Sequence, residues 1–151
     1  MKAYRKIGIL LLIIFVVMQF AQPKKNKAEG LGENDISKVY VIPDGLHKTL
    51  VKKCYDCHSN NTRYPWYFHI QPIGWWLAAH VHDAKEELNF SDFKKYDAER
   101  SAHKLEELGE VAQDRSMPLE AYTALHKQTE ITDEDEKAIK DWLSSVKRVT
   151  P

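Results

Sequence analysis

Cysteine is scarce in this chain of 151 residues, which contains only Cys54 and Cys57. Two cysteines three positions apart cannot form a framework of disulfide bonds, so the Cys-x-x-Cys pair needs an explanation of its own. The chain also lacks internal repeats and Gly/Ser-rich tracts. These absences exclude a small disulfide-stapled scaffold and a repeat architecture.

An excess of charge of one sign is missing too, because 22 basic residues balance 22 acidic ones. Three of the bases, Lys2, Arg5 and Lys6, fall in residues 1–22, where no acidic residue occurs. The remainder of the chain is therefore mildly acidic and offers no electrostatic case for binding nucleic acid. We expect no nucleic-acid partner.

One long apolar run is present, from Ile7 to Ala21, behind the basic start of the chain. This is the pattern of an export signal. The run is shorter than the roughly 20 residues of a spanning helix, yet no convincing Ala-x-Ala cleavage site follows it. Residues 1–22 are thus either an uncleaved anchor, which holds the protein in the inner membrane facing the periplasm, or a cleaved signal, which leaves it periplasmic.

Residues 23–43 are polar, and we interpret them as a tether that ends in a short extended stretch at residues 39–42. Residues 44–151 are predicted to form one domain. Capping residues and apolar periodicity predict helices in five places: from 44 into the Cys-x-x-Cys pair, over 73–88, over 97–113, over 119–127, and from 132 onward. No pair of strands is predicted, so the fold class is all-α.

His58 follows the two cysteines directly, and Cys-x-x-Cys-His is the attachment motif of c-type haem. On a tight helical turn, thiols at positions i and i+3 lie on one side of the chain, where they can add to the two vinyl groups of one porphyrin. The next residue then places its imidazole over the iron. The sequence predicts one haem c, covalently bound to Cys54 and Cys57, with His58 as the proximal iron ligand.

Other uses of the cysteine pair fit less well. A zinc site needs four ligands, and there is no second cysteine pair. A thioredoxin-like redox pair expects a βαβ context, which the helical pattern does not provide. Because covalent haem c is assembled outside the cytoplasm, the haem interpretation also requires residues 23–151 to lie outside it.

His58 needs a partner for its second ring nitrogen, since an acceptor for that N–H fixes the imidazole. The carbonyl groups of Pro65 and Pro72 are candidates, because loop carbonyls lack regular partners. Both prolines fall in residues 59–72, an aromatic stretch with neither helical nor strand period that is predicted to be a wrapping loop.

The second axial ligand separates the possible functions. Two strong side-chain ligands suit electron transfer, whereas an open position suits ligand binding or peroxide chemistry. Met117 is the leading distal ligand, because it is the only methionine outside the N-terminal segment and Pro118 favours an extended backbone before it. His80 is the main alternative, followed by His69 and His82.

Three further residues are predicted to surround the haem. Trp66 and Trp76 are expected in the pocket wall, and Arg63 is a candidate partner for a haem propionate through its fork of N–H donors. A surface position for Arg63 is the alternative. His47, His103 and His126 are interpreted as solvated helix residues.

Several stretches of the chain carry a family likeness: Cys-Tyr-Asp-Cys-His-Ser-Asn-Asn-Thr-Arg-Tyr-Pro-Trp-Tyr, Trp-Trp-Leu with His-Val, Leu-Asn-Phe-Ser, and Met-Pro-Leu-x-x-Tyr, at residues 54–67, 75–77 with 80–81, 88–91 and 117–122. With these stretches the chain resembles the small haem-binding-domain family common in Bacteroidetes-type bacteria. The resemblance implies a membrane-associated or periplasmic c-type haem protein, similar in outline to class I cytochromes c. An insert of about 58 residues between His58 and Met117 sets the chain apart from typical small cytochromes c.

We therefore predict a cytochrome c-like helical domain around a covalent haem, preceded by a hydrophobic segment. Its leading function is that of a monohaem electron carrier rather than an enzyme, with His58 and Met117 on the iron and redox proteins as partners. One alternative is a five-coordinate haem enzyme that reduces peroxide, with His80 or His69 as the distal acid or base. The other is a sensor in which a diatomic gas or another signalling ligand displaces Met117.

Overall fold

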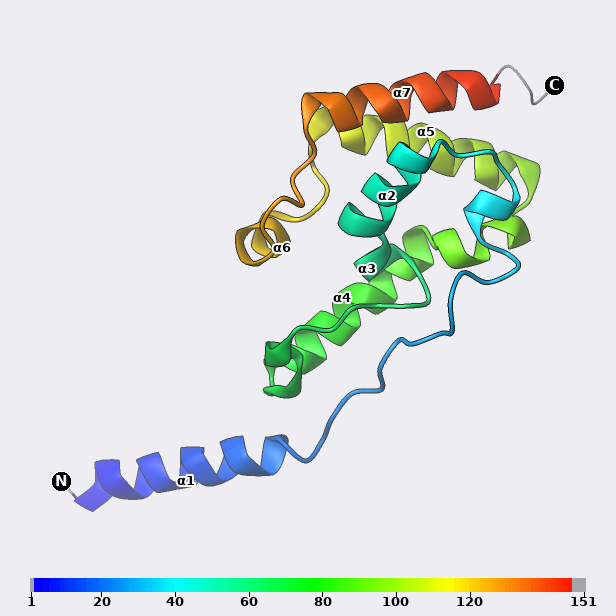
Figure 1. Cartoon of the computed structure of the whole chain (residues 1–151). Coiled ribbons are helices and arrows are strands. Elements are labelled where there is room, and N and C mark those ends of the chain that lie inside the picture. Colours follow the sequence, from blue (N-terminus) through cyan, green and yellow to red (C-terminus); the bar gives the residue numbers. More distant parts are fainter. Residues whose placement is uncertain (1, 148–151) are drawn as a thin grey trace.

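The computed structural model describes residues 2–147, which contain helices and no strand, so the all-α prediction is confirmed (Figure 1). The α-helices are α1 (Lys2–Met18), α2 (Asp44–Lys53), α3 (Tyr55–His58), α4 (Ile73–Glu87), α5 (Ala98–Asp114), α6 (Glu120–Leu125) and α7 (Asp133–Lys147). Three short 3-10 helices, η1 (Ile36–Lys38), η2 (Trp66–His69) and η3 (Phe90–Lys95), lie between them.

The starts of α5 and α7 are fixed by local capping, as predicted. Asp97 accepts a hydrogen bond from the backbone N–H of Arg100 at 2.7 Å. The backbone N–H of Thr132 donates to the carboxylate of Asp135 at 2.9 Å, and the backbone N–H of Asp135 donates back to the Thr132 hydroxyl at 3.3 Å. These bonds satisfy N–H groups that the first helical turn leaves without partners.

The first helix of the domain does not run straight into the cysteine motif. It ends at Lys53, and Cys54 leaves the helical conformation with φ −121° and ψ −40° before α3 begins. The stretch predicted to be extended at residues 39–42 does not start at Val39, which keeps helical angles, and Tyr40 lies in a bend. The helix α6 is also shorter than the predicted 119–127.

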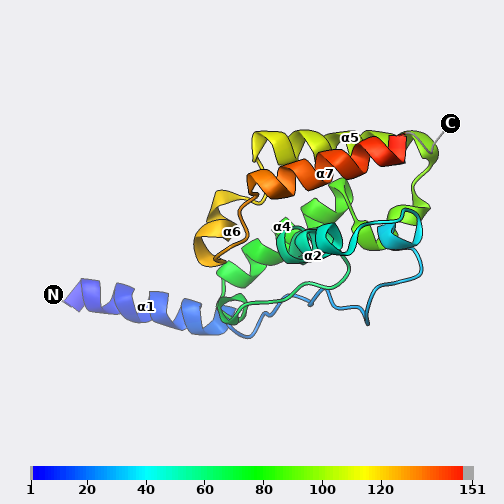
Figure 2. The ribbon, with the colours of Figure 1, turned by 45° about the horizontal axis from the view of Figure 1, so that its top comes forward.

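The core lies where α5 and α7 run side by side and α2 crosses them, an arrangement visible from both directions (Figure 2). The predicted apolar stripe of α7 is buried there, and it consists of Ile139, Trp142, Leu143 and Val146. The indole N–H of Trp142 donates to the carbonyl of Val41 at 3.0 Å, which satisfies the polar end of a side chain that is only 3 % exposed.

Residues 23–43, expected to be a tether, are packed along the domain. The side-chain amide of Asn26 donates to the carbonyl of Ser59 at 2.7 Å and to the hydroxyl of Thr62 at 2.9 Å. Ile36 is completely buried in the core. The polar composition suggested a free segment, but these polar groups are hydrogen-bond partners of the loop that follows the cysteine motif.

The start of α4 is pressed against η2. A Cβ atom added at Gly74 would lie 2.1 Å from the carbonyl oxygen of Phe68, so only glycine allows this approach. Gln71 is completely buried beside it and accepts a hydrogen bond from the backbone N–H of Trp75 at 3.0 Å. This packing sets the direction of α4, which carries residues of the candidate site at its other end.

The helix α1 projects away from the other helices (Figure 1). Its apolar side chains are exposed at successive positions and therefore on all sides, for example from Leu10 to Ile13. Within residues 2–147, no helix is both long and apolar enough to cross a membrane.

Replacing Gly74 by alanine is expected to lower the free energy of unfolding by at least about 1–3 kcal/mol, because the added methyl group meets backbone that cannot move aside. Gly45→Ala is the matched control, because Gly45 lies in α2 and an added Cβ atom would have nothing within 4 Å. The free energy of unfolding is expected to rise there by roughly 0.5–1 kcal/mol. Urea unfolding of both variants checks this. Equal effects at the two positions would contradict the close contact at Gly74.

Candidate functional site

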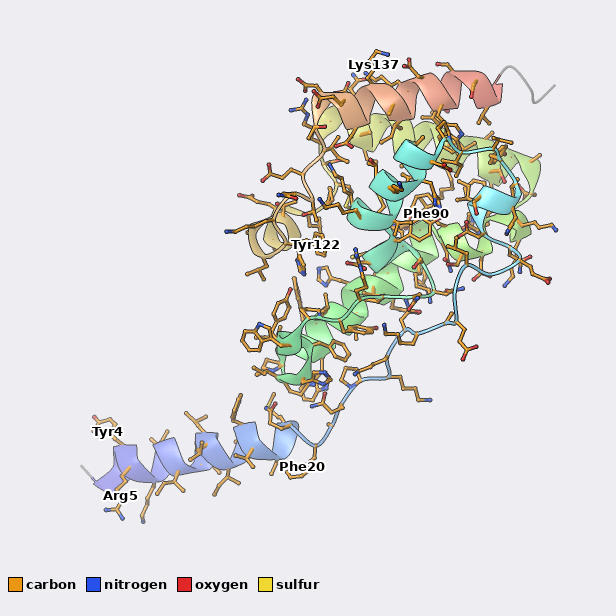
Figure 3. All side chains as sticks on the ribbon, viewed as in Figure 1. Tyr4, Arg5, Phe20, Phe90, Tyr122 and Lys137 are labelled. Carbon is orange, nitrogen blue, oxygen red and sulfur yellow. The ribbon has the colours of Figure 1, made fainter. Side chains whose placement is uncertain are left out.

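A cavity of about 770 Å³ lies between α3, α4, α5 and the segment that leads into α6. Phe90 and Tyr122 line it from η3 and α6 (Figure 3). Its volume is within the range of roughly 300–1,000 Å³ that is usual for small-molecule and cofactor sites. Five of the predicted site residues line it together: Cys54, Cys57, His58, His80 and Met117.

The cysteines stand at a tight turn. The backbone N–H groups of Cys57 and His58 both donate to the carbonyl of Cys54, at 3.2 and 3.0 Å. Both thiols are free, and burial raises the pKa of Cys54 to about 12 and that of Cys57 to about 11. The raised pKa values mean that this environment favours the neutral thiols over thiolates. Reactive redox cysteines show the opposite, a lowered pKa.

His58 is held by a backbone carbonyl. Its Nδ1 lies 3.0 Å from the carbonyl oxygen of Leu88, and because that oxygen can only accept, Nδ1 carries the hydrogen. Burial is the main cause that lowers the pKa of His58, which favours the neutral ring. Nε2 is then the nitrogen that offers a lone pair to a metal.

The sequence suggested the carbonyl of Pro65 or of Pro72 as the acceptor for His58, and this prediction is wrong, because the acceptor is Leu88. Leu88 follows the last residue of α4 and has extended backbone angles, φ −141° and ψ 125°. Its carbonyl lies beyond the regular helix, where it is available to a side chain. The prediction of a loop carbonyl was correct in kind, but the loop is the one after α4.

Met117 lines the cavity from the segment between α5 and α6, and Pro118 lies beside it in the same wall. Its side chain is 39 % exposed. The helix α5 ends at Asp114 and is followed by Arg115 in the left-handed conformation, φ 53°, which turns the chain toward this wall. His58 and Met117, 59 positions apart in the sequence, thus face one cavity.

His80 also lines the cavity, from α4. Its Nδ1 lies 3.0 Å from the carbonyl oxygen of Trp76, so its Nε2 is again the nitrogen with a lone pair. The other two candidate ligands do not line the cavity: His69 is exposed in η2, and His82 is exposed with its Nε2 3.3 Å from a carboxylate oxygen of Glu86.

The three residues expected around the haem, Arg63, Trp66 and Trp76, do not line the cavity. Arg63 bonds through Nε to the carboxylate of Asp56 at 2.9 Å, and it does not line the cavity. Trp66 is 76 % exposed, and Trp76 lies half-exposed against the ring of His80. The stretch that contains Trp66 packs on the first turn of α4, whereas the cavity is lined by α4 residues from His80 onward. Trp76 lies one turn before His80 in the same helix.

Asp56, between the two cysteines, was not singled out from the sequence. Its buried carboxylate also accepts a hydrogen bond from the hydroxyl of Tyr122 at 2.7 Å. Burial first, and then this bond, raise the pKa of Tyr122. Asp56 thereby joins α3 to the loop at Arg63 and to α6, just after Met117. Both residues occur in the stretches that carry the family likeness, but sequence spacing does not reveal their pairing.

The donor set and the cavity fit a covalently attached haem: two neutral thiols on one turn, an imidazole with a fixed tautomer, and a thioether in the same lining. Elsewhere in residues 2–147, the side chains grouped closely enough to hold a metal ion are the exposed His82, Asp83 and Glu86. That group includes neither cysteine, so it gives no support to a zinc site at the motif.

Comparison with known proteins identifies one family. A family model described as a haem-binding domain matches residues 13–145, which is most of the chain and includes the cavity. No curated protein and no solved structure gives a significant match.

The bond between Asp56 and Tyr122 yields a prediction for stability. Tyr122→Phe is expected to lower the free energy of unfolding by about 1–3 kcal/mol, because it removes a hydrogen bond from a buried carboxylate. Tyr67→Phe, whose hydroxyl has no hydrogen-bond partner among the described residues, is the matched control. Urea unfolding of Tyr122→Phe, Asp56→Asn and the double variant completes the test. The two changes are expected to be coupled by more than about 0.5 kcal/mol; additive effects would contradict the contact.

Proposed function

The chain belongs to the haem-binding domain family, and we propose that it is a c-type haem protein that works as a monohaem electron carrier facing the periplasm. One observation carries the proposal: Cys54, Cys57, His58 and Met117 line a single cavity of cofactor size. These are the residues that covalent attachment and two axial ligands require.

Attachment would use the two thiols at the turn. Each sulfur would form a bond to one carbon of a vinyl group, and the thiol hydrogen would move to the other carbon. The raised pKa values of Cys54 and Cys57 are in keeping with this use, because a thiol and a thioether are both neutral. Attachment would therefore bury no charge in a cavity wall that disfavours one.

His58 and Met117 would hold the iron of the haem. A bound haem supplies exchange of one electron between ferric and ferrous iron. His58 offers Nε2 while the carbonyl of Leu88 holds the ring in place. A thioether ligand from Met117 favours the reduced state and raises the reduction potential. Two protein ligands leave no position for a substrate, which suits an electron carrier.

The cavity lining suggests the charge of the redox partner. Its acidic residues outnumber the two lysines, Lys53 and Lys104, and they are Asp56, Asp83, Glu86, Glu87, Glu107 and Glu110. We propose redox partners with a basic surface, because the acidic side chains at the cavity would orient that surface toward the cavity. Small and weak interfaces are usual for electron transfer.

Residues 1–22 are proposed to hold the protein at the inner membrane, with the domain on the periplasmic side where covalent haem is assembled. The apolar side chains exposed on all sides of α1 support an anchor. If the segment is cleaved, the domain is periplasmic.

A second candidate function is favoured by His80, because this residue shares the cavity with His58 and has its Nδ1 bound to a backbone carbonyl. In this second function, His80 would act as a distal acid or base on a ligand of the iron. The protein would then reduce peroxide or sense a small ligand.

Substitution of Met117 tests the iron ligation. The full chain, produced with a c-haem maturation system, is expected to hold low-spin haem that survives acid-acetone extraction. Met117→Ala is expected to abolish the charge-transfer band of the methionine–iron bond, and His80→Ala, the matched control, to keep it. Optical spectra of the ferric and ferrous forms decide. A spectrum that changes with His80 and not with Met117 would identify His80 as the ligand.

Ligand binding separates the electron carrier from the second candidate. With both axial positions filled by the protein, ferrous haem is expected to bind carbon monoxide at most slowly, whereas Met117→Ala is expected to bind it readily. Stopped-flow mixing and a peroxide-turnover assay measure the two activities. Rapid carbon monoxide binding by the native protein, together with peroxide turnover that His80→Ala loses, would favour the enzyme.

A further inference from the structure

Three of the four tryptophans lie at one end of the molecule and are exposed. They form, with two apolar neighbours, what we call the aromatic surface: Phe20, Trp66, Ile73, Trp75 and Trp76. The fourth, Trp142, is only 3 % exposed in the core, whereas Trp66 is 76 % exposed. Large apolar side chains that are exposed together at one end of a molecule indicate an interaction site.

The aromatic surface meets the end of α1. Figure 3 shows Phe20 at that end, below the first turn of α4. The indole N–H of Trp75 donates to the carbonyl of Ala21 at 2.6 Å. The backbone N–H of Gln71 donates to the side chain of Gln19 at 2.8 Å, and the side chain of Gln19 donates back to the carbonyl of Gln71 at 3.2 Å. These bonds fix the end of α1 against η2 and α4.

The length of α1 suggests where the aromatic surface lies. Its 17 residues rise about 26 Å, less than the hydrocarbon thickness of about 30 Å. A short apolar helix draws its flanking residues into the interface. The residues that flank α1 here are the aromatic surface.

The chemistry of the flanking residues suits a lipid interface. Tryptophan is enriched at headgroup level, because its ring is apolar while its N–H group is polar. The exposed basic residues Lys24, Lys25 and Lys27 follow directly and would face anionic headgroups. The tryptophans, the basic residues and the contact with α1 thus all indicate that this surface binds lipid headgroups.

We propose that the aromatic surface lies in the headgroup region of the bilayer that α1 enters, so that the folded domain rests directly on the membrane. This inference depends on the anchor in the proposed function. The proposal also places the cofactor cavity near the membrane, because α4 carries both Trp76 of the aromatic surface and His80 of the cavity wall. One turn of helix separates them, about 6 Å along the axis, so electron exchange would take place close to the membrane.

Labelling depth tests the proposal in the full chain with haem attached, in vesicles of phosphatidylcholine and phosphatidylglycerol. A single cysteine is introduced as Trp66→Cys, Val16→Cys or Lys137→Cys and labelled with the fluorophore NBD. Val16 lies in α1, and Lys137 lies exposed on α7, far from α1 (Figure 3). Lipids that carry a nitroxide near the headgroup quench the fluorophore at contact.

Loss of fluorescence at positions 16 and 66, with none at 137, is the expected result. Loss at position 16 alone would overturn the proposal and leave the anchor standing. Loss at none of the three would overturn the proposal together with the anchor. Fluorescence ratios with and without nitroxide remove any constant quenching by the haem, and an unchanged haem spectrum shows that each variant is folded.

Discussion

The hydrogen bond from Nδ1 of His58 to the carbonyl of Leu88 joins the cysteine motif to the end of α4, and the site depends on it. Neighbouring hydrogen bonds also join the loop after the cysteine motif to η3, which follows Leu88. Asn60 donates from its backbone to the hydroxyl of Ser91 at 3.1 Å and from its side chain to Asp92 at 2.8 Å. These bonds help to keep the carbonyl of Leu88 beside the imidazole, and such outer partners tune a metal ligand as much as they orient it.

A second constraint starts from the same four-residue helix. Asp56 in α3 holds Arg63 on one side and Tyr122 on the other, and Tyr122 belongs to the helix that follows Met117. The bond between Asp56 and Tyr122 thus joins α3 to α6, and both residues line the cavity. The carboxylate is buried and accepts hydrogen bonds from four donors, which are the backbone N–H and two guanidinium nitrogens of Arg63 and the hydroxyl of Tyr122. Such hydrogen bonds are how proteins keep a buried carboxylate without a large cost.

Local features could be predicted from the sequence, and contacts between distant segments could not. The caps at Asp97 and Thr132 and the apolar stripe of α7 follow from residues within one or two turns of each other. The acceptor for His58 lies 30 residues away, and Trp66 points outward only because η2 packs on the start of α4. Composition likewise suggested a free tether, since it does not reveal that Ile36 enters the core.

The helix α4 connects the aromatic surface with the contact that holds His58. Its first turn belongs to the aromatic surface, where Gln71 and Gly74 lock it against η2. Its last turn leads to Leu88, which holds the imidazole of His58. Helices are stiff along their axis, so a displacement at one end is transmitted to the other. Whatever holds the first turn of α4 therefore also holds the imidazole of His58. One helix thus connects the proposed membrane contact with the proposed iron ligand.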